Sequence, residues 1–257
     1  LLVLVNGKEY RRSYSISSSY LNNESLQIGV KRVNGGVVSN FLNDHLKHGE
    51  QLRVMLPQGN FTLDRIATGT ETLILIAGGS GITPVLSLIK EALHSTQLNV
   101  KLLYGNKGVQ DIMYLSDLQK LKEQFGERLA ITHILENTEN SEVFENVESG
   151  LLSASNTKDI LGKKGIKAGN NAFFICGPTL MMQAAEEGLK TMDTPPSQVF
   201  VEYFSSPVET GNKSTISDTN NDFKGKAAVE VTLDDETFTI DIDSKSTILS
   251  TLLEQGI

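Results

Sequence analysis

Two glycine-containing segments have the composition of phosphate-binding turns. The first, Gly78-Gly79-Ser80-Gly81-Ile82-Thr83-Pro84, follows the apolar run Leu73–Ala77 and precedes the amphipathic run Val85–Leu93. This order predicts a buried parallel strand, a turn and a helix, with Thr83 as the N-cap and Pro84 as the first helical residue. Glycines let a diphosphate approach backbone N–H groups, and the helix dipole favours its charge. The pattern indicates a dinucleotide site, although an ordinary strand–helix connection can have the same composition.

A second turn of this type lies nearer the N-terminus. Gly35-Gly36-Val37-Val38-Ser39 leads into a predicted helix, Asn40–Lys47, with Ser39 as its N-cap. Upstream, Arg12-Ser13-Tyr14-Ser15 places Arg12 and Tyr14 on one face of a presumed strand. An arginine can hold a phosphate through two hydrogen bonds and a tyrosine can stack on a planar ring, although ordinary strand surface is the alternative. Two phosphate-binding turns predict two dinucleotides.

The composition favours small molecules or proteins as partners. Lys and Arg number 23 against 31 Asp and Glu, a net charge of −8, and no basic tract is longer than a pair such as Lys31-Arg32 or Lys163-Lys164. Nucleic acids and anionic membranes are therefore not expected. The only cysteine, Cys176, excludes an internal disulfide and a multi-cysteine metal site within these residues, so we predict no metal ligands. A thiol with no partner for a disulfide favours the cytoplasm. The apolar opening, Leu1–Val5, is too short for a membrane span and does not oppose this.

The order of apolar runs predicts an α/β domain between two other segments. Before residue 67, short β-type runs broken by Ser, Asn and Gly predict a small antiparallel β domain or barrel. From 67 to 206, strands alternate with helices, which is typical of a parallel sheet covered by helices. The strands are expected at Leu73–Ala77, Val100–Tyr104, Leu129–Leu135, Ala172–Cys176 and Val199–Phe204, and the helices at Pro84–His94, Ile112–Phe125 and Leu180–Met192.

The remaining residues read as a linker and the beginning of a third domain. Residues 207–226 are rich in Ser, Thr, Asn, Gly and Asp, as flexible linkers are. Residues 227–257 contain a predicted hairpin, Ala228–Leu233 with Thr237–Ile242, and a predicted helix, Thr247–Glu254. About thirty residues cannot bury a core of their own. We therefore expect this segment to be part of a larger domain.

With these motifs in this order, the chain resembles the ferredoxin–NADP reductase superfamily over residues 1–206, especially the reductase components of phenylacetyl-CoA epoxidase and of ring oxygenases. The resemblance implies a flavin β-barrel domain (1–66), an NAD(P) domain (67–206), a linker (207–226) and a partial β-grasp ferredoxin-like domain (227–257). The first barrel strands and the cysteine ligands of a plant-type cluster are not among these residues. We therefore expect a portion of a longer protein.

The resemblance also implies a role for each motif. For FAD it implies Arg12 on the phosphate, Tyr14 against the isoalloxazine ring and Ser15 near its reactive nitrogen, with Val30, Lys31, Arg32, Gly36, Val37, Val38 and Ser39 along the ribityl chain and pyrophosphate. For the nicotinamide dinucleotide it implies Gly79, Ser80, Gly81 and Thr83. Cys176-Gly177-Pro178 matches a segment whose thiol lies by the nicotinamide, although a buried small residue is the alternative for Cys176. Glu202-Tyr203-Phe204 resembles a closing Glu-x-Phe, which places Glu202 and Phe204 near the flavin.

These roles predict electron transfer from NADPH through FAD to a [2Fe–2S] centre and on to an oxygenase, as in phenylacetate-type aromatic degradation. Ser15, Cys176 and Glu202 line the junction as the catalytic set, with no obligate general base among them. NADPH is expected because Tyr104–Lys107 lacks the acid that reads a ribose 2′-hydroxyl, and Asn106 and Lys107 can meet a 2′-phosphate; NADH remains possible. Two alternatives stay open: a cluster-free flavin reductase serving free or haem acceptors, and a flavin-bearing protein without catalytic turnover.

Overall fold

The computed structural model describes residues 1–19, 24–166, 169–204, 226–233, 236–243 and 251. The chain divides into two compact units, Leu1–Val208 and Glu209–Ile257. The boundary expected between residues 66 and 67 falls inside the first unit and stays a prediction. The linker expected at 207–226, the hairpin turn Asp234-Asp235 and most of the expected helix Thr247–Glu254 lie outside the described residues.

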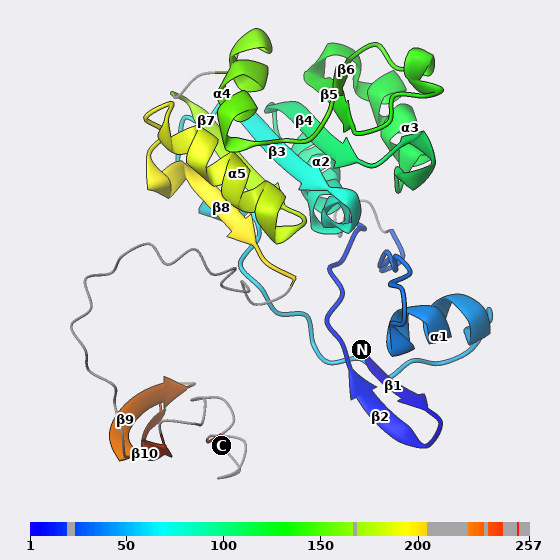
Figure 1. The fold of residues 1–257 in the computed structure, drawn as a ribbon, viewed down its shortest axis with the longest axis vertical. Helices are drawn as coiled ribbons and strands as arrows, with labels where there is room; N and C mark the ends of the chain where they lie inside the picture. Colours follow the sequence, from blue (N-terminus) through cyan, green and yellow to red (C-terminus); the bar gives the residue numbers. More distant parts are fainter. Residues whose placement is uncertain (20–23, 167–168, 205–225, 234–235, 244–250, 252–257) are drawn as a thin grey trace. The chain divides into compact units, whose positions relative to one another are not determined.

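A six-stranded parallel sheet forms the centre of the first unit. Its strand order is β6-β5-β4-β3-β7-β8, so the chain runs outward from β3 in one direction and then returns to β3's other side (Figure 1). In open α/β sheets this reversal places a crevice at the carboxyl ends of the two central strands. The strands are β3 (Thr72–Gly78), β4 (Asn99–Asn106), β5 (Leu129–Leu135), β6 (Val147–Ser149), β7 (Asn171–Cys176) and β8 (Val199–Glu202).

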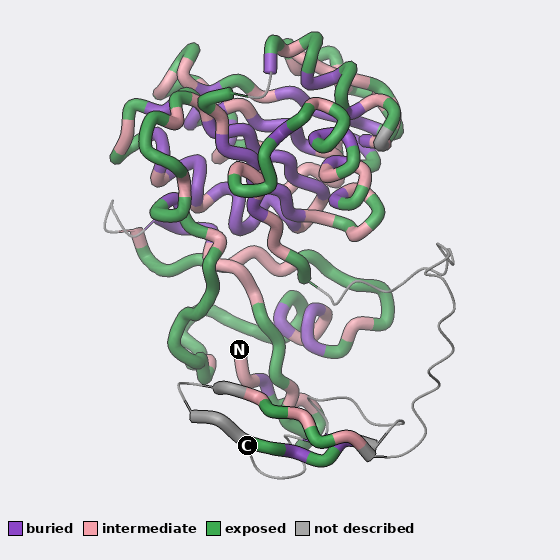
Figure 2. The backbone as a smooth tube through the Cα atoms, turned by 90° about the vertical axis from the view of Figure 1, so that its left-hand side faces the viewer, coloured by how far each residue is buried: buried purple, intermediate pink, exposed green. Residues whose placement is uncertain are grey.

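Helices cover both faces of this sheet, as the alternating pattern predicts. Helices α2 (Ile82–Ser95) and α3 (Leu115–Phe125) pack on one face, and α4 (Ala154–Lys163) and α5 (Thr179–Lys190) pack on the other. Figure 1 shows the two pairs on opposite sides of the strands, and Figure 2 shows the buried residues concentrated here. The apolar run of β3 is buried from Leu73 onward, because a central parallel strand is covered on both faces.

Helices α2 and α3 start at other residues than the sequence predicts, and α4 was not predicted. Helix α2 begins at Ile82 with Gly81 at its N-cap, so Thr83 is not the cap; its hydroxyl instead donates to the Ser80 carbonyl at 2.9 Å. Helix α3 begins at Leu115 and not at Ile112, because Tyr114 adopts the left-handed region with φ 58°. In the polar stretch 138–171, α4 begins at a capping box between Ser153 and Asn156 that was not predicted.

The N-terminal region is antiparallel, as expected for the flavin domain. Strands β1 (Leu2–Val5) and β2 (Lys8–Arg11) form a hairpin around Asn6-Gly7, both of which have positive φ, as a type I′ turn requires. Isolated antiparallel bridges join Leu2 to Arg53 and Ile16 to Ile28. Within residues 1–19 and 24–66 these strands do not close a barrel.

Helix α1 (Val37–His45) begins three residues earlier than the predicted Asn40–Lys47. Ser39 is therefore not its N-cap but lies in the first turn, where its hydroxyl accepts the Val33 N–H at 3.2 Å. Helix α1 packs against β1 through Val3, Val38 and Leu42, which are buried together. In the second unit, β9 (Lys226–Leu233) and β10 (Glu236–Asp243) form the expected antiparallel hairpin.

Acid stability of the sheet should depend on His133. This β5 residue is 5% exposed beside Phe144, with a ring separation of 4.1 Å, and burial lowers the pKa of its imidazole to about 4. Because the unfolded chain takes up the proton near pH 6.5, stability present above that pH is lost as the pH falls toward 4, by about 3 kcal/mol.

The test is urea unfolding from pH 7 to pH 4, monitored by circular dichroism. The His133→Leu variant should lose less stability over that range than the wild type. The control His48→Leu, at an exposed position, should keep the wild-type acid loss. Equal losses in all three proteins would contradict the assignment to His133.

Candidate functional site

The carboxyl ends of β3 and β7 carry two turns whose backbones touch. A Cβ built on Gly81 would overlap the carbonyl oxygen of Cys176, and one on Gly177 would lie 2.9 Å from the backbone nitrogen of Gly78. Gly79 has a φ of +50°, which also favours glycine. The predicted turns Gly78–Gly81 and Cys176–Pro178 are thus parts of one packed structure. It lies at the N-terminus of α2, which no side chain caps.

Two side chains that sequence reasoning missed support this structure. The hydroxyl of Tyr104 donates to the Gly79 carbonyl at 3.0 Å and accepts the Met113 N–H at 3.2 Å. Tyr104 is fully buried, and burial raises the pKa of its hydroxyl, so it stays a donor. Met181 fills the space above Gly78, where an added Cβ would lie 2.5 Å from its sulfur. The position of Tyr104 at the end of a buried strand was a usable signal; Met181 carried none.

The three residues expected to be catalytic come together beside this turn. Ser15 donates a hydrogen bond to Oε2 of Glu202 at 3.3 Å across 187 residues of sequence. Cys176 is the register partner of Glu202 in adjacent strands. Burial raises the pKa of the Cys176 thiol and the charge of Glu202 raises it further, so the thiol is protonated at neutral pH. It therefore suits packing against a ring better than nucleophilic attack.

Glu202 lies in a partly desolvated place. Burial raises the pKa of its carboxyl, while the hydrogen bond from Ser15 opposes that shift. The next residue, Tyr203, donates to Glu186 of α5 at 2.9 Å, which fixes the chain where it leaves the sheet. Phe204 is 49% exposed and follows directly, so its ring is available to a ligand.

The residues predicted to hold FAD lie around α1 and the hairpin. The Arg12 guanidinium lies 5.9 Å above the Tyr10 ring and donates to the Arg11 carbonyl. Tyr14 is half-buried in the cluster that contains Val30 and Val38, and burial raises the pKa of its hydroxyl against the opposing charge of Arg12.

The turn before α1, like the one before α2, leads into a helix that no side chain caps. A Cβ built on Gly36 would lie 2.6 Å from the Ser39 hydroxyl, and no side chain caps the helix. Val38 is buried and Val37 is 44% exposed. Arg32 forms an ion pair with Asp44 at 2.5 Å. Lys31 extends instead toward the other turn, with Nζ 3.6 Å from a Cβ built on Gly79.

The last predicted coenzyme residues lie at the end of β4. Asn106 is buried and Lys107 is exposed just beyond the strand. Pro178 contacts Gly78, with its Cδ 2.7 Å from an added Cβ. Asn106 and Lys107 therefore lie at the carboxyl ends of the strands, as the glycine turn does, because Gly78 and Gly105 are register partners.

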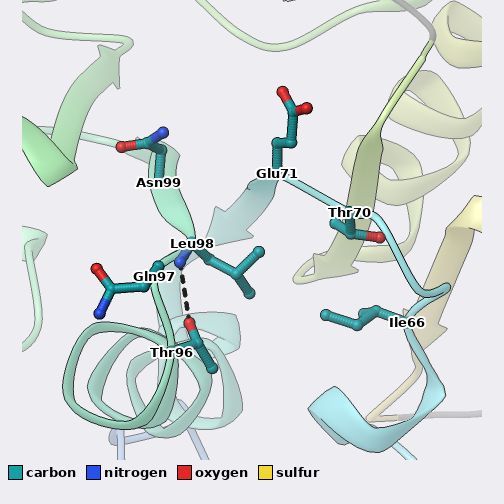
Figure 3. Close-up of a pocket in the computed structure, with 7 residues that line it drawn as sticks. All are labelled: Ile66, Thr70, Glu71, Thr96, Gln97, Leu98 and Asn99. Carbon is teal, nitrogen blue, oxygen red and sulfur yellow. Dashed lines mark hydrogen bonds between the residues drawn. The ribbon is translucent and has the colours of Figure 1, made fainter.

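The hollow drawn in Figure 3 lies at the opposite end of the strands, where β3 and β4 begin. Its lining residues precede β3 or lead into β4, among them Thr70, Glu71 and Asn99. It therefore has no part in the candidate site. Across the described residues, no three His, Cys, Asp or Glu side chains are grouped for a metal ion. No described helix is long and apolar enough to cross a membrane.

Family models match both halves of the first unit. The oxidoreductase FAD-binding domain matches residues 1–63, and the oxidoreductase NAD-binding domain matches residues 75–187. The chain belongs to the ferredoxin reductase family of FAD- and NAD-binding oxidoreductases. The matches confirm the predicted family and the two predicted cofactor-binding domains; the individual site residues stay predictions.

Relatives and solved structures agree with this assignment. The chain is 33% identical over 249 residues to the ferredoxin reductase component of 3-ketosteroid-9-alpha-monooxygenase from Mycobacterium tuberculosis, covering 96% of this chain and 64% of the relative. It is 34% identical over 207 residues to a component of 1,2-phenylacetyl-CoA epoxidase from Escherichia coli, covering 79% and 56%. The chain therefore spans less than two thirds of these curated relatives.

A solved structure shows the same fold. The FAD/NAD-binding domain of nitric oxide dioxygenase from Vibrio cholerae superposes with a TM-score of 0.66 at 22% identity, covering 79% of this chain and 81% of that one. At this identity the likeness concerns the fold alone. It confirms the predicted combination of an antiparallel flavin domain with a parallel α/β domain.

The packing of Gly81 gives a direct test of the site. Gly81→Ala should lower the free energy of unfolding by about 1–3 kcal/mol, because the methyl group meets the Cys176 carbonyl and the backbone must move. It should also weaken binding of NADP⁺, measured by calorimetry, while FAD is retained.

The matched control is Gly105→Ala in the neighbouring strand. A Cβ there would lie 3.7 Å from its nearest neighbours, which is ordinary contact. Its stability and coenzyme binding should stay within about 0.5 kcal/mol of the wild type. A Gly81→Ala protein as stable as the control would contradict the close contact between the two turns.

Proposed function

We propose that the protein is the NADPH-dependent flavin reductase component of an oxygenase system. The observation that carries this proposal is the hydrogen bond between Ser15 and Glu202. It joins the segment expected to touch the flavin to the strand beside Cys176, the residue expected to touch the nicotinamide. The two cofactor-binding domains therefore meet where a reaction between their cofactors would occur.

The residues present fit a dinucleotide at each turn. At α2, the glycine backbones leave no room for side chains, and the uncapped helix N-terminus offers N–H groups to a diphosphate. At α1, Gly36 and the uncapped first turn offer the same arrangement, with Arg12 and Tyr14 nearby for a phosphate and a ring. When bound, the nicotinamide and the flavin supply the hydride chemistry themselves.

The side chains at the junction then bind, orient and exclude water. The protonated thiol of Cys176 offers an uncharged packing surface. Glu202 accepts from the Ser15 hydroxyl and thereby holds the flavin-side segment at the end of β8. Phe204 extends from the same strand end toward solvent, where a ring ligand could be covered. Their role is geometric, because reacting atoms must lie within about 3–3.5 Å.

An oxygenase is the acceptor we propose, on the strength of the relatives. The names of the two curated relatives refer to a steroid monooxygenase and to phenylacetyl-CoA epoxidase. We favour aromatic degradation of the phenylacetate type from the motif resemblance. A cytoplasmic location is supported by the free cysteine, and the net charge of −8 argues against nucleic acids and anionic membranes.

A [2Fe–2S] centre does not fit the residues of this chain. Such a cluster needs four thiolates, whereas the 257 residues hold one cysteine, which is buried at the end of β7. We propose the hairpin β9–β10 as the opening of a ferredoxin-like domain, because the match to the M. tuberculosis reductase covers 96% of the chain. A cluster-free reductase is the second candidate, and it differs from the first in having no set of cluster-ligating cysteines in the full-length protein.

Absorption spectra and anaerobic reduction test the proposal. The purified full-length protein should be yellow with FAD and should bleach when NADPH is added. Broad additional absorption would indicate an iron–sulfur centre, and its absence the cluster-free reductase. Bound flavin that neither NADPH nor NADH bleaches would contradict the proposed reductase and favour a flavin-bearing protein without turnover.

Flavin retention should depend on Arg12. Arg12→Ala removes a charge-assisted phosphate contact, so FAD affinity should fall by about 1.5–3 kcal/mol, roughly ten- to a hundredfold. The neighbouring Arg11→Ala is the matched control and should retain FAD as the wild type does. Equal FAD affinity in the two variants would show that Arg12 is ordinary surface.

Coenzyme preference should depend on Lys107. A cation near a 2′-phosphate contributes about 1–2 kcal/mol when partly exposed, so Lys107→Glu should reduce the NADPH/NADH ratio of kcat/KM about five- to thirtyfold. The same charge change in Lys190→Glu, at the far end of α5, is the control. The ratios are measured at fixed ionic strength, because salt screens exposed pairs. A ratio that both substitutions leave unchanged would make Lys107 a solvated loop residue.

A further inference from the structure

Three consecutive serines are buried just after the predicted flavin motif. Ser17, Ser18 and Ser19 are 0%, 5% and 2% exposed. Buried polar groups need hydrogen-bond partners, and here the partners come from two directions. The Ser17 N–H donates to the Gln27 carbonyl, and the Ser18 hydroxyl accepts the Gln27 N–H at 3.0 Å, both within the flavin-side segment.

The other partners belong to the nucleotide domain. The Ser17 hydroxyl lies 2.9 Å from the hydroxyl of Tyr114, and Ser87 of α2 donates to the Ser18 carbonyl at 3.0 Å. Close packing reinforces these bonds, since a Cβ on Gly29 would lie 2.5 Å from the Tyr114 oxygen. The serine run is therefore held between its own segment and α2.

One ion pair completes this contact. Lys90 of α2 places Nζ 3.0 Å from Oε2 of Glu24, and the lysine is only 7% exposed. The same carboxylate oxygen accepts the Ser19 N–H at 2.9 Å. Burial favours the neutral acid, but the bonds from Ser19 and Lys90, with the charge of His94, outweigh it and lower the pKa of Glu24. The pair is thus charged, with the lysine buried and the Glu24 side chain 28% exposed.

This contact connects the two candidate cofactor sites through a short path. Ser15 lies two residues before the serine run, and the glycine turn ends where α2 begins. Helix α2 therefore carries the nucleotide-binding turn at its N-terminus and the anchor of the flavin-side segment on its side. Displacing that segment would move Tyr14 and Ser15 relative to Gly79 and Gly81.

We infer that the Glu24–Lys90 ion pair is a positioning element that sets the alignment of the flavin against the nicotinamide. The inference rests on the proposed function, and it concerns residues outside the motifs that bind either cofactor. An exposed ion pair would be a poor choice for this role, because water replaces it readily. Here Lys90 is buried, so loss of Glu24 leaves the lysine charge without compensation, and loss of Lys90 removes the contact that holds Glu24 against α2.

The experiment uses the full-length, FAD-loaded protein and compares Lys90→Met and Glu24→Gln with the wild type. Stopped-flow reduction at saturating NADPH should be about ten- to a hundredfold slower in both variants, because small misplacements of reacting groups have effects of that size. FAD content and NADP⁺ affinity should be unchanged. The long-wavelength flavin–nicotinamide charge-transfer absorbance, which reports ring stacking, should weaken.

Amide hydrogen exchange gives a readout that does not depend on turnover. Exchange of Ser17 and Gln27 should be at least about tenfold faster in Lys90→Met, because their bonds open when the segment moves. The matched control is Glu187→Gln, which removes the exposed ion pair with Lys190. It should leave the reduction rate, charge-transfer absorbance and exchange at wild-type values.

The outcomes distinguish the positioning role of the ion pair from the proposed reductase function. A wild-type flavin that neither NADPH nor NADH reduces overturns the proposed function and the inference with it. A reduced wild type with wild-type reduction rates in folded, FAD-loaded Lys90→Met and Glu24→Gln overturns the positioning role alone. If Lys90→Met does not fold, Glu24→Gln decides, because its amide oxygen can still accept the Ser19 N–H.

Discussion

The contact between two backbones, at Gly81 and Cys176, is the constraint on which the rest of the site depends. The Cys176 carbonyl occupies the place where a side chain on Gly81 would begin. Because β3 and β7 are adjacent strands of one sheet, their turns emerge side by side and must interlock. The Tyr104 hydroxyl then donates a hydrogen bond to the Gly79 carbonyl, and Met181 fills the space where a Gly78 side chain would lie.

Desolvation acts in the same direction on four ionisable groups of the first unit, but at one of them its partners outweigh it. It keeps the Cys176 thiol and the Tyr104 hydroxyl protonated, and it raises the pKa of Glu202. At Glu24 the same penalty is outweighed by a lysine and a backbone N–H. The junction between the domains thus has a protonated thiol and a protonated hydroxyl where cofactors are expected, and a paired charge where the domains are joined.

The sequence was a good guide wherever a residue type determined local structure by itself. The buried strands were visible as apolar runs, since parallel strands are covered on both faces. Strand β6 and helix α4 could not be recognised in this way, because β6 is short and α4 begins at a polar capping box, Ser153 with Asn156. The helix starts at Thr83 and Ser39 were misplaced because glycine N-caps left these hydroxyls inside the first turn.

Tertiary contacts set the limit of that guide. The convergence of Ser15, Cys176 and Glu202 could be expected from the family resemblance that their motifs carry. The roles of Tyr104, Met181 and the serine run could not, because each depends on a partner far away in sequence. From the sequence alone the serine run is typical of an exposed loop, because its burial depends on hydrogen bonds such as the one from Ser87 of α2.

The unequal crowding around the glycine turn has a consequence for how this protein can change over evolution. At Gly81 and Gly177 the neighbouring backbone leaves no volume for a side chain, so the turn that we propose binds a diphosphate tolerates little substitution. A short distance along the same sheet edge, Lys107 is exposed. Mutations there can change the side chain that we propose meets the coenzyme while the scaffold stays intact. Packing therefore restricts substitution in the glycine turn and leaves Lys107 free to vary.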